Sequence, residues 1–128
     1  MIVDDDEVSN YIFGKLIGIA GFWKNIFHFE QAEKALAYIK ENVNRPENLP
    51  DVLFLDIVLR DMTGWEFLEK FETLPAGVKN KIYIVILTNS IFEKDRQLSG
   101  KYPSVKRYLT KPITLESLNE IRGEINNK

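Results

Sequence analysis

An unbroken apolar run, Val52-Leu53-Phe54-Leu55, ends at Asp56. A second run of this kind covers residues 82–87 and ends at Thr88. Strands that are apolar on both faces are typical of parallel sheets with helices packed on both sides. The two runs therefore predict central, buried strands of a parallel sheet, each followed by a polar side chain at its carboxyl end.

Shorter apolar runs and amphipathic stretches alternate around these two strands. Further strands are predicted at Ile2-Val3, at residues 26–29 and within residues 105–109. Apolar residues at helical spacing predict one helix over residues 7–20 and another from Ala32 to Val43. The alternation of strands and helices is typical of βαβ units, whose crossovers are right-handed.

Capping residues indicate where several helices begin. The candidates are Asp6 for the first helix, Thr63 with Glu66 and Ser90 with Glu93 as capping boxes, and Thr114 for the last helix. The whole pattern predicts five strands and five helices, which is a doubly wound α/β fold. The expected arrangement is a five-stranded parallel sheet in the flavodoxin-like order 2-1-3-4-5.

The composition excludes several classes of protein. The length predicts a single domain over residues 1–128, and the absence of cysteine excludes a disulfide-stapled module. A formal net charge of −2 is not typical of nucleic-acid binders, and no apolar run approaches the roughly 18–20 residues that span a membrane. The one histidine, His28, is predicted to be a packed or edge residue of its strand rather than a ligand.

Polar side chains of types that react or bind ligands follow the predicted strands at their carboxyl ends. They are Asp4, Asp5, Asp56, Thr88 and Lys111. In an open α/β sheet, ligands bind outside these ends where the strand order reverses, so the three aspartates should share one crevice. Crowded carboxylates raise one another's pKa unless a cation intervenes, and Mg²⁺ prefers such oxygen ligands. A carboxylate nucleophile, a metal and a lysine suit phosphoryl transfer through an aspartyl phosphate.

Four motifs in order resemble the receiver domain of two-component response regulators. They are Val3-Asp4-Asp5-Asp6-Glu7, Leu55 to Gly64, Ile86-Leu87-Thr88, and Tyr108 to Pro112. The resemblance covers essentially the whole chain. It departs at Arg60, where the family usually has proline, and at Asn89, where a small residue is usual. We expect a looser loop at Arg60 and altered access or phosphoryl lifetime at Asn89.

The resemblance implies a role for each of these residues. It implies that Asp56 accepts a phosphoryl group from a histidine kinase or a histidine phosphotransfer protein, with Mg²⁺ as cofactor. The implied metal ligands are Asp4, Asp5, Asp56 and the main-chain carbonyl of Val58, and the implied phosphoryl contacts are Thr88 and Lys111. Tyr108 would be the rotameric partner of Thr88, and the Lys111–Pro112 bond would be cis.

The resemblance also implies how the signal leaves the domain. Phosphorylation would change the surface formed by the fourth predicted helix, the fifth strand and the last helix. We expect a cytoplasmic single-domain regulator, a phosphoacceptor that promotes its own phosphorylation and dephosphorylation rather than an enzyme. Its output would be a protein partner, with no nucleic acid or membrane partner, and it would be a monomer or a weak dimer on activation.

Two other interpretations fit parts of the sequence. Asp4-x-Asp6-Glu7-Val8 matches the first motif of haloacid-dehalogenase-like phosphatases, in which Asp4 would be the nucleophile and Asp6 the acid/base. That class needs a further acidic pair after the lysine, and it leaves Asp56 without a role. The third interpretation is a receiver-like interaction module that is never phosphorylated, which the residues Arg60 and Asn89 keep open.

Overall fold

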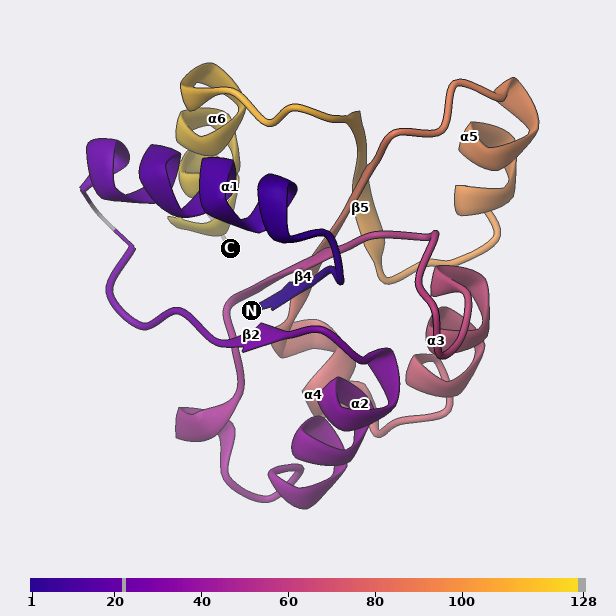
Figure 1. Ribbon diagram of the computed structural model, residues 1–128. Helices are drawn as coiled ribbons and strands as arrows, with labels where there is room; N and C mark the ends of the chain where they lie inside the picture. The colour runs from indigo at the N-terminus through magenta and orange to yellow at the C-terminus, as the bar shows by residue number, and fades with distance from the viewer. Residues whose placement is uncertain (22, 127–128) are drawn as a thin grey trace.

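The structure, a computed structural model, describes residues 1–21 and 23–126; Phe22 and residues 127–128 of the predicted domain lie outside the described residues. The described residues form one five-stranded parallel sheet in the order β2-β1-β3-β4-β5 (Figure 1). Its strands are β1 (Ile2–Val3), β2 (His28–Phe29), β3 (Val52–Leu55), β4 (Tyr83–Thr88) and β5 (Val105–Thr110). The predicted fold class and strand order are confirmed.

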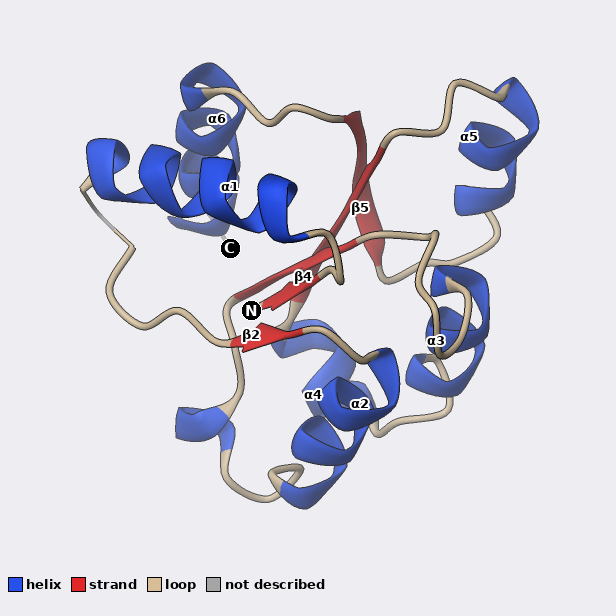
Figure 2. Ribbon diagram, in the orientation of Figure 1, coloured by secondary structure: helices blue, strands red, loops and turns tan. Residues whose placement is uncertain are grey.

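Helices connect the strands (Figure 2). They are α1 (Glu7–Ala20), α2 (Ala32–Glu41), α3 (Gly64–Phe71), α4 (Ala76–Lys81), α5 (Glu93–Ser99) and α6 (Leu115–Asn126), with a 3₁₀ turn at Pro46–Asn48. The predicted count of five α-helices is wrong by one over this part of the chain, because α4 was not anticipated. It buries only Val78, and one apolar residue leaves no periodicity to detect. No helix within the described ranges has the length and apolar character to cross a membrane.

The sheet has a hydrophobic cluster on each face. Alternate strand residues point to opposite faces, so Leu53 and Leu55 pack toward α2 and α3, whereas Val52 and Phe54 pack toward α1 and α6. Figure 1 shows α1 and α6 together on one side of the sheet and α2, α3 and α4 on the other. This two-sided burial explains the unbroken apolar run at residues 52–55.

Helix starts follow the predicted caps in three of four cases. Asp6 Oδ1 accepts hydrogen bonds from the Val8 and Ser9 N–H groups at 3.0 and 3.3 Å. Thr63 and Thr114 cap α3 and α6 by accepting from the backbone N–H three residues on.

The Ser90 cap is wrong, because α5 begins at Glu93 with Phe92 at the N-cap position. The Ser90 N–H donates to Thr88 Oγ1 at 3.2 Å, and the Ser90 hydroxyl bonds the Asp95 carboxylate. These contacts hold Ser90 in the β4–α5 loop, so the helix starts later than the capping pattern indicates.

Candidate functional site

Three side chains from separate strand ends meet at the carboxyl edge of the sheet. Lys111 Nζ lies 2.7 Å from Asp4 Oδ2 and 2.8 Å from Asp56 Oδ2. Asp4 and Asp56 are only 4% and 7% exposed, and the Lys111 side chain is equally buried. Two buried carboxylates therefore share one buried ammonium group, a concentration of charge that is rare in a core unless the partners are paired.

The electrostatics of the trio favour the charged lysine. Burial by itself lowers the pKa of Lys111, but the hydrogen bonds and charges of Asp4 and Asp56 outweigh it and raise the pKa above its ordinary value. The ammonium group thus stays protonated at neutral pH. With two carboxylates and one cation, the trio keeps an excess of negative charge.

Backbone contacts orient the Asp56 carboxylate. Its Oδ1 accepts the Val58 N–H at 3.0 Å, which leaves Oδ2 to Lys111. The loop that follows folds back onto the start of α3, where the Gly64 N–H donates to the Ile57 carbonyl at 2.9 Å. A Cβ atom on Gly64 would lie 2.6 Å from Ile57 Cα, so this close approach requires glycine.

Asp4 is held in the same way by groups around it. Its Oδ1 accepts the Asp6 N–H at 3.0 Å, and its backbone carbonyl accepts the Asn10 side-chain amide at 3.0 Å. A ring nitrogen of His28, on the edge strand β2, lies 3.3 Å from the same carbonyl. The edge placement of His28 is as predicted, whereas the contact of Asn10 with the site was not anticipated, because a helix-surface asparagine carries no distinguishing pattern.

Asp5 does not point into the trio. Its Oδ2 accepts the Arg60 N–H at 2.9 Å, and the Arg60 guanidinium Nε lies 3.8 Å away. Within residues 1–21 and 23–126, no three acidic or histidine side chains are arranged closely enough to hold a metal ion. The three aspartates therefore lie at the same edge of the sheet, but only Asp4 and Asp56 contact Lys111.

The donor chemistry at this edge still fits a hard divalent cation. Two buried carboxylates and the neighbouring, largely buried Asp5 offer only oxygen ligands, which Mg²⁺ prefers. The excess negative charge of the trio is the electrostatic reason for a cation to bind there. The Oδ2 oxygen of Asp5 is engaged by the Arg60 N–H.

Thr88 and Tyr108 lie on the β4 and β5 side of the site. Thr88 is completely buried, and its carbonyl accepts the Lys111 N–H at 2.8 Å. The Tyr108 ring packs against the core with the Arg96 guanidinium carbon 4.8 Å from its centroid. Burial raises the pKa of Tyr108 above its ordinary value, so the phenol stays neutral. The Lys111–Pro112 peptide bond is cis, as the resemblance implied.

Asp61 contributes to the site region in a way that the sequence analysis missed. Its two carboxylate oxygens accept the Ala32 and Glu33 N–H groups at 3.2 and 2.9 Å, and so cap α2. The residue at the N-cap position, Gln31, makes no such bond. A cap supplied from 28 or 29 residues away leaves no local sequence signal. It ties the loop that follows Asp56 to α2.

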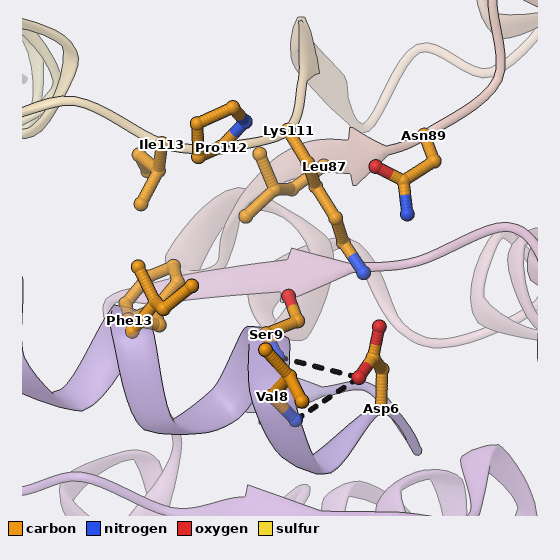
Figure 3. A pocket seen from close by; sticks show the side chains of 10 residues that line it. Asp6, Val8, Ser9, Phe13, Leu87, Asn89, Lys111, Pro112 and Ile113 are labelled. Atoms are coloured by element: carbon orange, nitrogen blue, oxygen red, sulfur yellow. Dashed lines mark hydrogen bonds between the residues drawn. The ribbon is translucent and has the colours of Figure 1, made fainter.

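A cavity of about 310 Å³ opens beside the trio. Its lining is Asp6, Val8, Ser9, Ile12, Phe13, Leu87, Asn89, Lys111, Pro112 and Ile113. Figure 3 shows the Lys111 side chain crossing this region, with Asn89 on one side and Asp6 on the other. Asn89 therefore lines a cavity that Lys111 also lines, and its effect on access to Asp56 stays a prediction.

Known proteins share this fold and part of the sequence. A cyclic di-GMP phosphodiesterase of Thermotoga maritima is 26% identical over 118 residues, which are 92% of this chain and 28% of that protein. The chain therefore spans less than a third of that relative. A solved two-component response regulator from Cytophaga hutchinsonii superposes with a TM-score of 0.90 at 23% identity, covering 99% of this chain and 95% of that one.

A further solved structure and a family model extend these likenesses. The Mn²⁺-bound form of a response regulator gives a TM-score of 0.72 at 23% identity, covering 97% of this chain and 88% of that one. The model of the response regulator receiver domain matches residues 1–122. Because that match takes in both the sheet and the edge with Asp4, Asp56 and Lys111, this chain belongs to the family of response regulator receiver domains, which act in two-component signalling.

Proposed function

We propose that this chain is a phosphoacceptor whose acceptor group is the Asp56 carboxylate. The observation that carries the proposal is the contact of Lys111 Nζ with Asp56 Oδ2 at 2.8 Å, in a buried site at the carboxyl edge of the sheet. A buried aspartate that is paired with a lysine and oriented by the Val58 N–H is a positioned nucleophile. The proposed donor is a phosphohistidine of a histidine kinase or a histidine phosphotransfer protein.

The reaction is a transfer between two nucleophiles. A carboxylate oxygen of Asp56 forms the new P–O bond while the P–N bond to the donor imidazole breaks, and the released imidazole nitrogen takes up a proton. Such transfers depend mainly on positioning and on neutralising the phosphoryl oxygens. Lys111 and the Thr88 hydroxyl are proposed to contact those oxygens.

Mg²⁺ is proposed as the cofactor, held by Asp4, Asp5, Asp56 and the main-chain carbonyl of Val58. When bound, it would supply positive charge beside the phosphoryl oxygens. The donor chemistry of the edge supports this assignment, and a similar response regulator has been solved with Mn²⁺. Before transfer, Lys111 partly neutralises Asp4 and Asp56 and so limits the repulsion between them.

The proposed output is a change of the surface formed by α5, β5 and α6, which correspond to the fourth predicted helix, the fifth strand and the last helix. Thr88 would move toward the phosphoryl group, and Tyr108 would take the space that its hydroxyl leaves. The bond from the Ser90 N–H to Thr88 Oγ1 links this movement to the start of the β4–α5 loop. A partner that prefers the altered surface would shift the population toward it.

The test is phosphorylation of the purified chain by a small acyl phosphate or phosphoramidate in the presence of Mg²⁺. We expect intact-mass spectrometry to show one added phosphoryl group that is lost on treatment with hydroxylamine, as an acyl phosphate would be. The adduct should be absent in Asp56→Asn and in the presence of a chelator. Asp61→Asn is the matched control, because it alters a carboxylate of the same loop that does not contact Lys111.

Two outcomes would support the alternatives instead. An unmodified chain with every donor would indicate an interaction module that is never phosphorylated. Steady hydrolysis of a phosphomonoester that is lost in Asp4→Asn but retained in Asp56→Asn would indicate a phosphatase. In the structure, Asp6 caps α1 through Oδ1, which accounts for the position of this aspartate without a catalytic role.

A further inference from the structure

The three aspartates of the site differ in what holds them. Asp4 and Asp56 both contact the buried Lys111 ammonium group. Asp5 instead accepts the Arg60 N–H at 2.9 Å through Oδ2, and its side chain is 18% exposed. The backbone of the loop after Asp56 therefore sets the orientation of this one carboxylate.

This contact engages one of the two carboxylate oxygens with which Asp5 could bind a metal ion. In the described residues, Asp5 does not converge with Asp4 and Asp56 on a common point. A hydrogen bond to a charged carboxylate is about twice as strong as one between neutral groups. The Arg60 N–H occupies Oδ2 of Asp5, so a cation that takes up this oxygen would have to displace the N–H, and the lost bond would subtract from the free energy of binding.

We propose that Arg60 weakens the binding of a divalent cation at this site, because its backbone N–H competes for the Asp5 carboxylate. The inference rests on the proposed function, in which Asp5 is a metal ligand. Arg60 is then a positioning residue that sets the cation concentration at which the site fills. It acts through Asp5 and needs no contact with the phosphoryl group.

The backbone and side chain of Arg60 contribute unequally. The Arg60 side chain is 90% exposed and its Nε lies 3.8 Å from Asp5, so solvent screens this ion pair. The N–H bond at 2.9 Å is the stronger contact. Arg60→Ala removes only the guanidinium group, whereas Arg60→Pro removes the N–H as well. The pair of variants therefore separates the two contributions.

The experiment is calorimetric titration of the full chain with MgCl₂, without a phosphodonor. We expect Arg60→Pro to lower the Kd for Mg²⁺ by about tenfold, since it removes a hydrogen bond to a charged group. Arg60→Ala should change the Kd by less than about threefold. The same Arg60→Pro substitution made in an Asp5→Asn background should give no tightening, because the effect acts through the Asp5 carboxylate.

A second measurement avoids substitution altogether, since proline also restricts the backbone of Leu59. In the unaltered chain, the amide proton shift of Arg60 reports its hydrogen bond to Asp5. We expect this resonance to move upfield in proportion to the fraction of sites filled by Mg²⁺. Thermal unfolding of each variant shows whether it remains folded.

The outcomes distinguish this inference from the proposed function. If Mg²⁺ binds but Arg60→Pro leaves the Kd unchanged and the Arg60 amide does not move, Arg60 does not compete and the inference is wrong. If the tightening persists in the Asp5→Asn background, it does not act through Asp5, and the inference is also wrong. If Mg²⁺ does not bind to any variant, both the inference and the metal assignment fail, whereas phosphorylation of Asp56 is tested separately.

Discussion

Lys111 Nζ lies 2.8 Å from Asp56 Oδ2, although the two residues follow strands that are not neighbours in the sheet. β4 lies between β3 and β5, and its last residue, Thr88, is completely buried. The long lysine side chain spans this strand and reaches both Asp56 and Asp4. One cation thus connects three strand ends, and its removal should affect both stability and chemistry.

Lys111→Met should destabilise the fold. The substitution leaves Asp4 and Asp56 buried without their counter-charge, and loss of one partner of a buried ion pair costs about 3 kcal/mol. Urea unfolding without added metal measures the change in the free energy of unfolding. Lys101→Met is the control, because Lys101 is exposed and its loss should change stability by less than about 0.5 kcal/mol. Equal stabilities of the two variants would contradict the structural role of Lys111.

The stabilising effect of Lys111 should depend on pH only in the alkaline range. The pKa of Lys111 is raised in the folded state, so the folded state binds its proton more tightly than the unfolded state does. The contribution is therefore complete below the ordinary pKa of 10.5 and is lost as the pH rises through the higher, folded value. The difference in unfolding free energy between wild type and Lys111→Met should stay constant from neutral pH to the ordinary pKa. A steady decline across the neutral range would contradict this assignment.

Gly64→Ala should disturb the phosphoacceptor loop. The new Cβ would lie 2.6 Å from Ile57 Cα and 2.9 Å from the Asp56 carbonyl oxygen, and both are backbone atoms that cannot swing aside. We expect a loss of about 2 kcal/mol in unfolding free energy, typical of overpacking, together with slower phosphorylation. Gly14→Ala in α1 is the control, because no heavy atom outside the neighbouring backbone of the helix itself lies within 4 Å of its Cβ position. It should stabilise the helix by roughly 0.5–1 kcal/mol, and similar losses in both variants would refute the argument.

Asp61→Ala should remove the cap of α2. The two N–H groups that Asp61 satisfies would be left to solvent, which costs about 1 kcal/mol for a typical cap. Burial raises the pKa of Asp61, but the hydrogen bonds from Glu33 and Ala32 outweigh it and lower the pKa below its ordinary value of 3.8.

The sign of its pH dependence follows from that shift. The stabilising contribution of Asp61 is present above pH 3.8 and is lost as the pH falls through the lower, folded pKa. The free energies of unfolding of wild type and Asp61→Ala should therefore become equal in acid. Glu33→Gln is the control, since it keeps the N–H donor and should change stability by only a few tenths of a kcal/mol. A difference in unfolding free energy between wild type and Asp61→Ala that persists at pH 2 would contradict the capping role.

Tyr108→Ala should separate phosphorylation from its proposed output. The variant keeps Asp56, Lys111 and Thr88, so it should acquire the phosphoryl group as wild type does. Without the phenol ring, phosphorylation should no longer change amide hydrogen exchange in α5 and β5. Tyr102→Phe is the control, because Tyr102 donates to Glu69 Oε1 on α3, away from the site. A phosphorylation-dependent change in Tyr108→Ala equal to that of wild type would show that the coupling does not run through Tyr108.

The alternation of apolar runs with amphipathic stretches determines the fold class from the sequence alone. Residues 52–55 and 82–87 are buried on both faces, as is typical of strands in a parallel sheet covered by helices on both sides. Because Asp4, Asp56 and Lys111 each follow a strand of a parallel sheet, the sequence also predicts that they lie at the same edge. The helix α4 was not predicted, because a six-residue helix with one buried side chain shows no hydrophobic periodicity.

Tertiary structure alone determined which groups pair at that edge. The sequence predicts that three aspartates lie together. In the structure, Asp4 and Asp56 contact Lys111, whereas Asp5 accepts a hydrogen bond from the Arg60 backbone N–H. The capping of α2 by Asp61 and the close approach at Gly64 are likewise contacts between segments distant along the chain or folded back on one another. Periodicity reports which face of an element is buried, whereas the direction of a hydrogen bond depends on loop geometry that only the folded chain sets.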